Sequence, residues 1–133
     1  MRVVRYLYRL PLLLLHIVLM LPLTLLAMMP PWGRLRVNGE PLEELAVRLW
    51  SGGLMWVFGF RLQRHGRPLD GAVLFVANHV SWVDIEMLHS QKMMGFVAKR
   101  EIASWPLVGW LAARGQTIFH QRGSTESQGG VME

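Results

Sequence analysis

The chain has 133 residues, of which 52% are hydrophobic and 17% charged, with a formal net charge of +5. This length leaves room for one ordinary domain, and the composition is too apolar and too weakly charged for a freely soluble domain of that size. The absence of cysteine excludes disulfide scaffolds, thiolate metal sites and thiol nucleophiles. A basic excess fits nucleic acid or an anionic membrane surface, and the apolar content favours the membrane.

The first predicted element is a membrane helix over about residues 10–29. Leu10 to Met29 carry no charge, and a run of that length at ~1.5 Å per residue spans a hydrocarbon core of ~30 Å. A signal peptide opens in the same way, but this apolar run is long and no small-residue cleavage site follows it. We therefore interpret it as a retained transmembrane helix, with His16 as a tolerated polar residue.

A second apolar helix is predicted over about residues 42–59, so residues 1–59 are predicted to form a membrane anchor. Pro41 suits the start of this helix, and Glu43 and Glu44 follow near the positive end of its dipole. Its apolar part is too short to span a bilayer. It either lies at the membrane interface or packs on the domain as a buried helix.

The orientation of the anchor is left open by the positive-inside rule. Three arginines flank each end of the first apolar segment, at positions 2, 5 and 9 and at positions 34, 36 and 48. A single crossing would place the N-terminus and the rest of the chain on opposite faces. A monotopic hairpin made of both apolar segments would keep them on the same face.

Short strands and helices are predicted to alternate from residue 60 onward. The strands are expected at 60–64, 73–77, 95–98 and 117–119. A helix is expected at about 82–90, and two short helical pieces between Arg100 and Arg114, interrupted at Pro106. Strands that alternate with helices predict an α/β sandwich.

The segment Asn78-His79-Val80-Ser81-Trp82-Val83-Asp84 follows the second of these strands. A neutral imidazole can take a proton from a hydroxyl near neutral pH when a carboxylate fixes its tautomer, and Asp84 is the nearest candidate for His79. Ser81, three residues before Asp84, also gives the pattern that opens a helix. The alternative is therefore that Asp84 is only the capping partner of Ser81, and His79 only a turn residue.

These residues resemble a known family. The segment from Asn78 to Asp84 is similar to the first block of the glycerophospholipid acyltransferases, typified by lysophosphatidate acyltransferase, with its HxxxxD motif. Residues 96–101 and 105–110 (FVAKRE and WPLVGW) are similar to the family's linking segment, and 117–122 (TIFHQR) to its second block. The resemblance covers roughly residues 60 to 123. Together with the predicted N-terminal membrane helix, it implies an incomplete α/β sandwich of the glycerophosphate-acyltransferase type over residues 60–133.

The resemblance also implies an activity. An acyl thioester, either acyl-CoA or an acyl-carrier protein, would donate its acyl group to the free hydroxyl of a lysophospholipid. Lysophosphatidate is the default acceptor and a lyso-ornithine lipid the alternative. His79 and Asp84 would be catalytic, and Arg122, Phe119 and Asn78 would bind substrate; arginine suits a phosphate monoester because it binds in a bidentate manner. No metal or cofactor is implied. The catalytic part would face the cytoplasm, with a bacterial inner membrane as the expected location.

The chain also departs from the family pattern. Gly115 falls one residue early, His120 stands at a normally aliphatic position, and the family's third block is absent from residues 123–133. We therefore expect the N-terminal part of an acyltransferase, either a fragment or a truncated product. A non-catalytic membrane-anchored fragment is the alternative function. Nucleic-acid binding is disfavoured because the basic residues are scattered and flank apolar segments.

Overall fold

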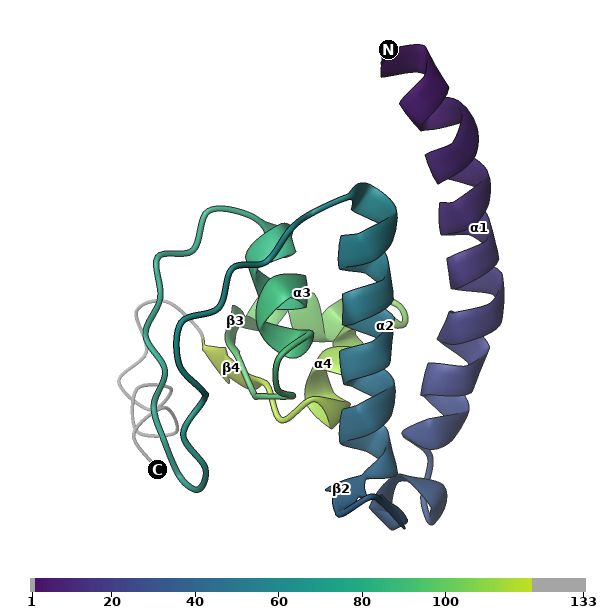
Figure 1. Ribbon diagram of the computed structural model, residues 1–133. Helices are drawn as coiled ribbons and strands as arrows, with labels where there is room; N and C mark the ends of the chain where they lie inside the picture. The colour runs from purple at the N-terminus through teal and green to yellow at the C-terminus, as the bar shows by residue number, and fades with distance from the viewer. Residues whose placement is uncertain (1, 121–133) are drawn as a thin grey trace. The chain divides into compact units, whose positions relative to one another are not determined.

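The computed structural model of the protein describes residues 2–120 (Figure 1). It divides into two compact units, one ending at Met93 and the other beginning at Met94. The first unit holds two long helices and a shorter third one, and the second holds a small parallel sheet with two short helices. The mixed helix and strand content and the apolar N-terminal helix agree with the prediction.

The first helix, α1, has 26 residues, Arg2–Ala27, so it begins before the predicted start and ends close to the predicted end. It continues through Pro11 and Pro22. Its apolar stretch is long enough to cross a membrane, and only 6% of that stretch is buried inside the chain. A helix that is apolar all round is normally buried in a core or in a membrane. The exposed apolar surface of α1 therefore fits a membrane helix.

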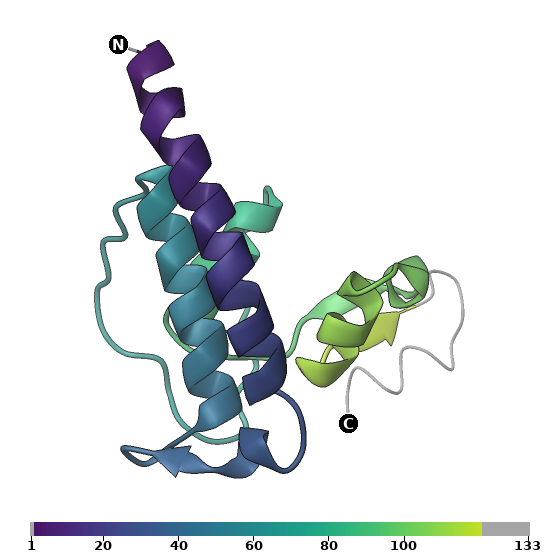
Figure 2. The same cartoon turned by 90° about the vertical axis from the view of Figure 1, so that its right-hand side faces the viewer.

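A second helix, α2 (Leu42–Phe58), returns beside α1, so the two helices form a hairpin (Figures 1 and 2). The connection contains η1 (Trp32–Arg34) and the short strands β1 (Arg36–Val37) and β2 (Glu40–Pro41), which pair antiparallel. Asn38 and Gly39 turn the chain between these strands with φ of 53° and 85°. This strand pair was not predicted, although Asn-Gly is a strong signal for such a turn.

The core of the first unit lies along one face of α2. Its buried apolar side chains in this helix are Ala46, Val47, Leu54, Met55 and Val57. The hairpin is joined near its middle by His16, whose Nε2 lies 3.0 Å from the carbonyl oxygen of Trp50 and whose ring packs 4.9 Å from that of Trp50. A Cβ at Gly53 would collide with the His16 ring, so glycine permits this approach. His16 thus joins the two helices.

Residues 60–81 form no helix or strand. The strands predicted at 60–64 and 73–77 are therefore wrong. The apolar side chains of the second segment are exposed, with Leu74 at 81% and Val76 at 88%. A strand needs a neighbour to accept and donate its backbone hydrogen bonds, and both strand pairs of the described chain are formed by other residues. The next helix, α3 (Trp82–His89), lies where it was predicted.

The second unit contains two parallel strands, β3 (Val97–Lys99) and β4 (Ile118–His120), with Ala98 opposite Phe119. Each strand lies within two residues of its predicted position. Between them come η2 (Arg100–Ser104) and α4 (Val108–Arg114), which confirms the predicted interruption at Pro106. The described residues form two two-stranded sheets, and the α/β sandwich remains a prediction.

Candidate active site

The Asn78–Asp84 motif occupies the turn before α3 and the first turn of that helix. One carboxylate oxygen of Asp84, Oδ2, accepts hydrogen bonds from the backbone amides of Ser81 at 2.8 Å and Val80 at 2.7 Å. The bond from Ser81 is the acidic half of a capping box. Two backbone donors on one oxygen fix the carboxylate relative to the turn that carries His79.

His79 faces this carboxylate. Its Nδ1 lies 3.4 Å from Asp84 Oδ2, which is longer than an ordinary N–H···O hydrogen bond; catalytic hydrogen bonds are often long before substrate binds. The side chain of His79 is 59% exposed and that of Asp84 27%. The imidazole is therefore open to a substrate, while the carboxylate is partly covered. From the sequence, a capping role for Asp84 and a pairing of Asp84 with His79 were alternatives. In the structure Asp84 both caps α3 and lies beside His79.

The electrostatics of the turn keep Asp84 charged. The amide of Ser81 makes the largest contribution to lowering the pKa of the Asp84 carboxyl, and the amide of Val80 the next. Partial desolvation opposes them, and His79 adds smaller lowering contributions. An ionised carboxylate accepts a hydrogen bond and donates none, so it favours the imidazole tautomer that carries its proton on Nδ1. Nε2 of His79 is then the basic nitrogen.

Two contacts fix α3 to α2 within the first unit. The fully buried Ser51 donates a hydrogen bond from Oγ to Oε2 of Glu86 at 2.6 Å. Phe58 at the end of α2 packs edge-on against Trp82 at the start of α3, with ring centroids 5.8 Å apart. The His79–Asp84 pair therefore lies next to the C-terminal end of α2. The sequence alone did not pair Ser51 with Glu86 or Phe58 with Trp82, because no local pattern links positions so far apart along the chain.

The remaining predicted site residues are placed as follows. Asn78 is exposed in the same turn, directly before His79. Phe119 is partly buried in β4 of the second unit. Arg122 lies outside the described residues. The structure thus brings His79 and Asp84 together, with Asn78 beside them in the chain, and the proposed substrate-binding roles remain predictions.

A histidine that has a fixed carboxylate near one ring nitrogen and an open second nitrogen is a site suited to proton transfer with a hydroxyl. A sequence profile described as Acyltransferase matches residues 60–133, more than half of the chain. The chain belongs to the Acyltransferase family.

Curated relatives carry two kinds of name. The chain is 39% identical over 88 residues to a lyso-ornithine lipid O-acyltransferase of Pseudomonas aeruginosa, covering 66% of this chain and 34% of that protein. It is 42% identical over 86 residues to a 1-acyl-sn-glycerol-3-phosphate acyltransferase of Neisseria meningitidis, covering 64% of this chain and 34% of that protein. The chain thus spans about a third of the length of these relatives. No solved structure matches it.

Proposed function

We propose that His79 is the general base of an acyl transfer to a lysolipid hydroxyl and that Asp84 orients it. The observation that carries this proposal is the approach of His79 Nδ1 to a carboxylate that two backbone amides fix in place, in a chain of the Acyltransferase family. The chain has no cysteine to act as a thiol nucleophile. In this proposal the attacking oxygen is that of the substrate hydroxyl.

The proposed reaction proceeds in two proton-coupled steps. Nε2 of His79 removes the proton of the acceptor hydroxyl as that oxygen attacks the thioester carbonyl carbon, and the Asp84 carboxylate stabilises the imidazolium that forms. The tetrahedral intermediate then collapses, the carbon–sulfur bond breaks, and the imidazolium returns its proton to the leaving thiolate. The proposed acyl donor is acyl-CoA or an acyl-carrier protein, as the family resemblance implies.

The oxyanion of the intermediate needs hydrogen-bond donors. Amides near the start of α3 were the sequence-based candidates. The amides of Val80 and Ser81 already donate to Asp84. A donor from this turn would therefore be the amide of Trp82 or Val83, which follow them.

Lysophosphatidate remains our first proposed acceptor, with Arg122 holding its phosphate in a bidentate manner. A lyso-ornithine lipid is the second candidate. It is favoured by the names of several relatives, from Pseudomonas aeruginosa and Rhodobacter capsulatus among others. The identities of 39% and 42% to the two kinds of relative do not separate them.

The hairpin supports an orientation for the anchor. Because α2 returns beside α1, the start of α1 and the chain that follows α2 lie at the same end of the hairpin. The arginines at 61, 64 and 67 then count with those at 2, 5 and 9, against three at 34, 36 and 48. The two ends of α1 alone are flanked by three arginines each. In the hairpin, six arginines lie near the end shared by the start of α1 and the end of α2, and three near the other end. By the positive-inside rule, the His79 end faces the cytoplasm, at the inner membrane of a bacterium.

Replacement of His79 tests the proposal. The protein is expressed from its full coding sequence. Membranes of the expressing cells are then assayed for transfer of a labelled acyl group to lysophosphatidate and to lyso-ornithine lipid. We expect His79→Ala to lower the rate by roughly 10²- to 10⁴-fold, the usual contribution of a general base. His65→Ala is the matched control, since His65 is an exposed histidine of the loop before α3, and it should retain the full rate.

The result identifies the acceptor as well as the base. Transfer to one lysolipid alone, lost in the His79 variant, assigns the acceptor. Full transfer by His79→Ala would refute the mechanism. Absence of transfer to either lipid, with the protein present in the membrane, would favour the non-catalytic alternative.

A further inference from the structure

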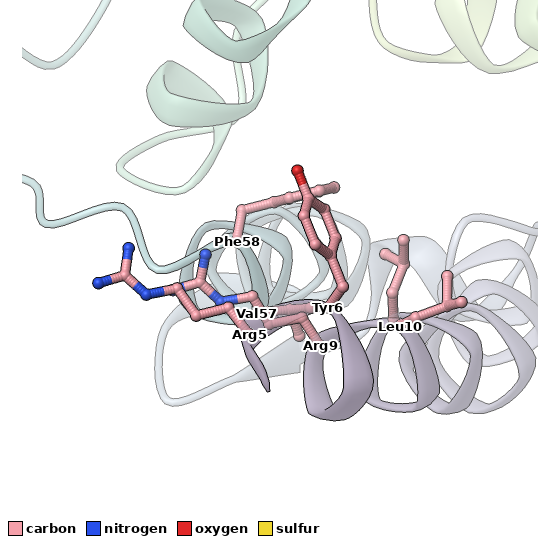
Figure 3. Close-up of a pocket in the computed structure, with 7 residues that line it drawn as sticks. Arg5, Tyr6, Arg9, Leu10, Val57 and Phe58 are labelled. Carbon is pink, nitrogen blue, oxygen red and sulfur yellow. The ribbon is translucent and has the colours of Figure 1, made fainter. Parts of the chain in front are cut away.

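A cavity of about 550 Å³ opens between the two helices of the hairpin, at the end where α1 begins and α2 stops (Figure 3). Its volume lies within the range of small-molecule sites, roughly 300–1,000 Å³. Seven residues line it, five from α1 and two from α2: Arg5, Tyr6, Arg9, Leu10, Leu13, Val57 and Phe58. None of them takes part in the acyl-transfer mechanism proposed above.

The polar part of the cavity is cationic. Arg5 and Arg9 are one helical turn apart on α1, which places them on the same face, and Figure 3 shows both side chains extending the same way, away from Leu10. The guanidinium of Arg9 lies over Gly59, the left-handed residue that ends α2. The chain has no acidic residue before Glu40, and within residues 2–120 neither arginine has a carboxylate partner.

The remaining lining is apolar and continues into the membrane-facing surface of α1. Leu10 directly follows Arg9 and Leu13 lies about one turn beyond it, and both line the cavity together with Val57 and Phe58 of α2. Beyond them, exposed apolar side chains cover α1 as far as Leu26. The site therefore presents two cations at the membrane surface and a hydrocarbon-like wall directed toward the bilayer interior.

We propose that this cavity binds one phospholipid with an anionic headgroup. The guanidinium groups of Arg5 and Arg9 donate hydrogen bonds to phosphate oxygens. The first part of one acyl chain lies along Leu10, Leu13 and Phe58. A soluble phosphate would leave that apolar wall uncovered, so the lipid is the occupant. A bound lipid also sets the depth of the hairpin at the headgroup layer. Because Phe58 packs on Trp82, the same layer holds the start of α3 and the His79–Asp84 pair.

Lipid retention tests this proposal without reference to catalysis. The 133-residue chain is purified in an uncharged detergent and mixed with phosphatidylglycerol or phosphatidylcholine, and the lipid retained per chain is measured by native mass spectrometry. We expect one retained phosphatidylglycerol, bound at least several-fold more tightly than phosphatidylcholine. Neutralising both cations, in Arg5→Gln/Arg9→Gln, should weaken phosphatidylglycerol binding by roughly 10-fold or more, since each basic side chain near an anionic lipid contributes substantially.

Two further variants make the test specific. Arg34→Gln/Arg36→Gln removes the same charge from the other end of the hairpin and should leave retention unchanged. Arg5→Lys/Arg9→Lys keeps the charge and should retain most of the affinity, and circular dichroism confirms the helix content of every variant. Equal loss in the two glutamine variants, equal retention of both lipids by the native chain, or displacement of the lipid by millimolar glycerol phosphate would each overturn the proposal.

Discussion

Two short apolar runs of this chain have opposite fates. In the second half of α2, Leu54 and Val57 are buried, at 7% and 5% exposure. In the run at 72–77, Leu74 and Val76 are exposed at 81% and 88%, and no strand forms. A helix satisfies its backbone hydrogen bonds within its own segment, whereas a strand depends on another segment beside it. Hydrophobicity is similar in the two runs, so the difference lies in where each finds its hydrogen-bond partners.

The candidate active site combines one residue of the irregular segment with one residue of a packed helix. Its histidine belongs to the irregular segment, and its carboxylate belongs to a helix that packs on α2. The two are joined by local bonds from the amides of Val80 and Ser81 to Asp84. A site built in this way keeps its His79–Asp84 geometry even though residues 73–77 do not form a strand in this structure.

Removal of a leucine side chain from each of the two runs tests this difference directly. Leu54→Ala should lower the free energy of unfolding by about 2–5 kcal/mol, since it deletes buried methyl groups and leaves a cavity. Leu74→Ala should change it by less than about 0.5 kcal/mol, as expected for an exposed position. Denaturant titrations of the chain in detergent micelles, followed by circular dichroism, measure both. Similar losses in the two variants would mean that residues 72–77 are buried in solution.

A sharper test lies within the hairpin, at two adjacent glycines. A Cβ at Gly53 would collide with the His16 ring, whereas a Cβ at Gly52 meets no atom within 4 Å. Gly53→Ala should displace His16 from Trp50 and destabilise the hairpin by about 1–2 kcal/mol, the scale of a lost hydrogen bond with some repacking. Gly52→Ala should stabilise it by about 0.5–1 kcal/mol, because alanine favours the helix. The same titrations measure the two changes, and a shared sign would contradict the close approach of the helices.

The same contrast explains how much the sequence could predict. The positions of α2 and α3 and the break at Pro106 follow from local patterns of charge, apolar residues and capping. The approach of His79 to Asp84 could also be predicted from the sequence, because the capping interaction that fixes Asp84 lies within the motif itself. The strand at 73–77 was predicted wrongly because its composition says nothing about a partner. Ser51 and Glu86 were missed for the related reason that only the fold brings them together.

The capping carboxylate of Asp84 should make a small contribution to stability that depends on pH. The pKa of Asp84 is lowered in the folded chain, so its carboxylate contributes stability above its ordinary pKa of 3.8, and this contribution is lost as the pH falls through the lower folded value. Asp84→Asn should therefore be less stable than the native chain at pH 7, and the difference should shrink below about pH 4. Unfolding titrations at both pH values measure it.

Asp70→Asn is the matched control for this last prediction. It removes a carboxylate that is 99% exposed and paired with Lys92 on the surface, and such pairs contribute little. If the Asp84 variant kept its full deficit in acid, the carboxylate charge would not be what secures the turn. The conformation of residues 78–84 would then depend on the contacts of Trp82 and Glu86 with α2. Non-local contacts, and not the local bonds to Asp84, would hold the His79–Asp84 pair in place.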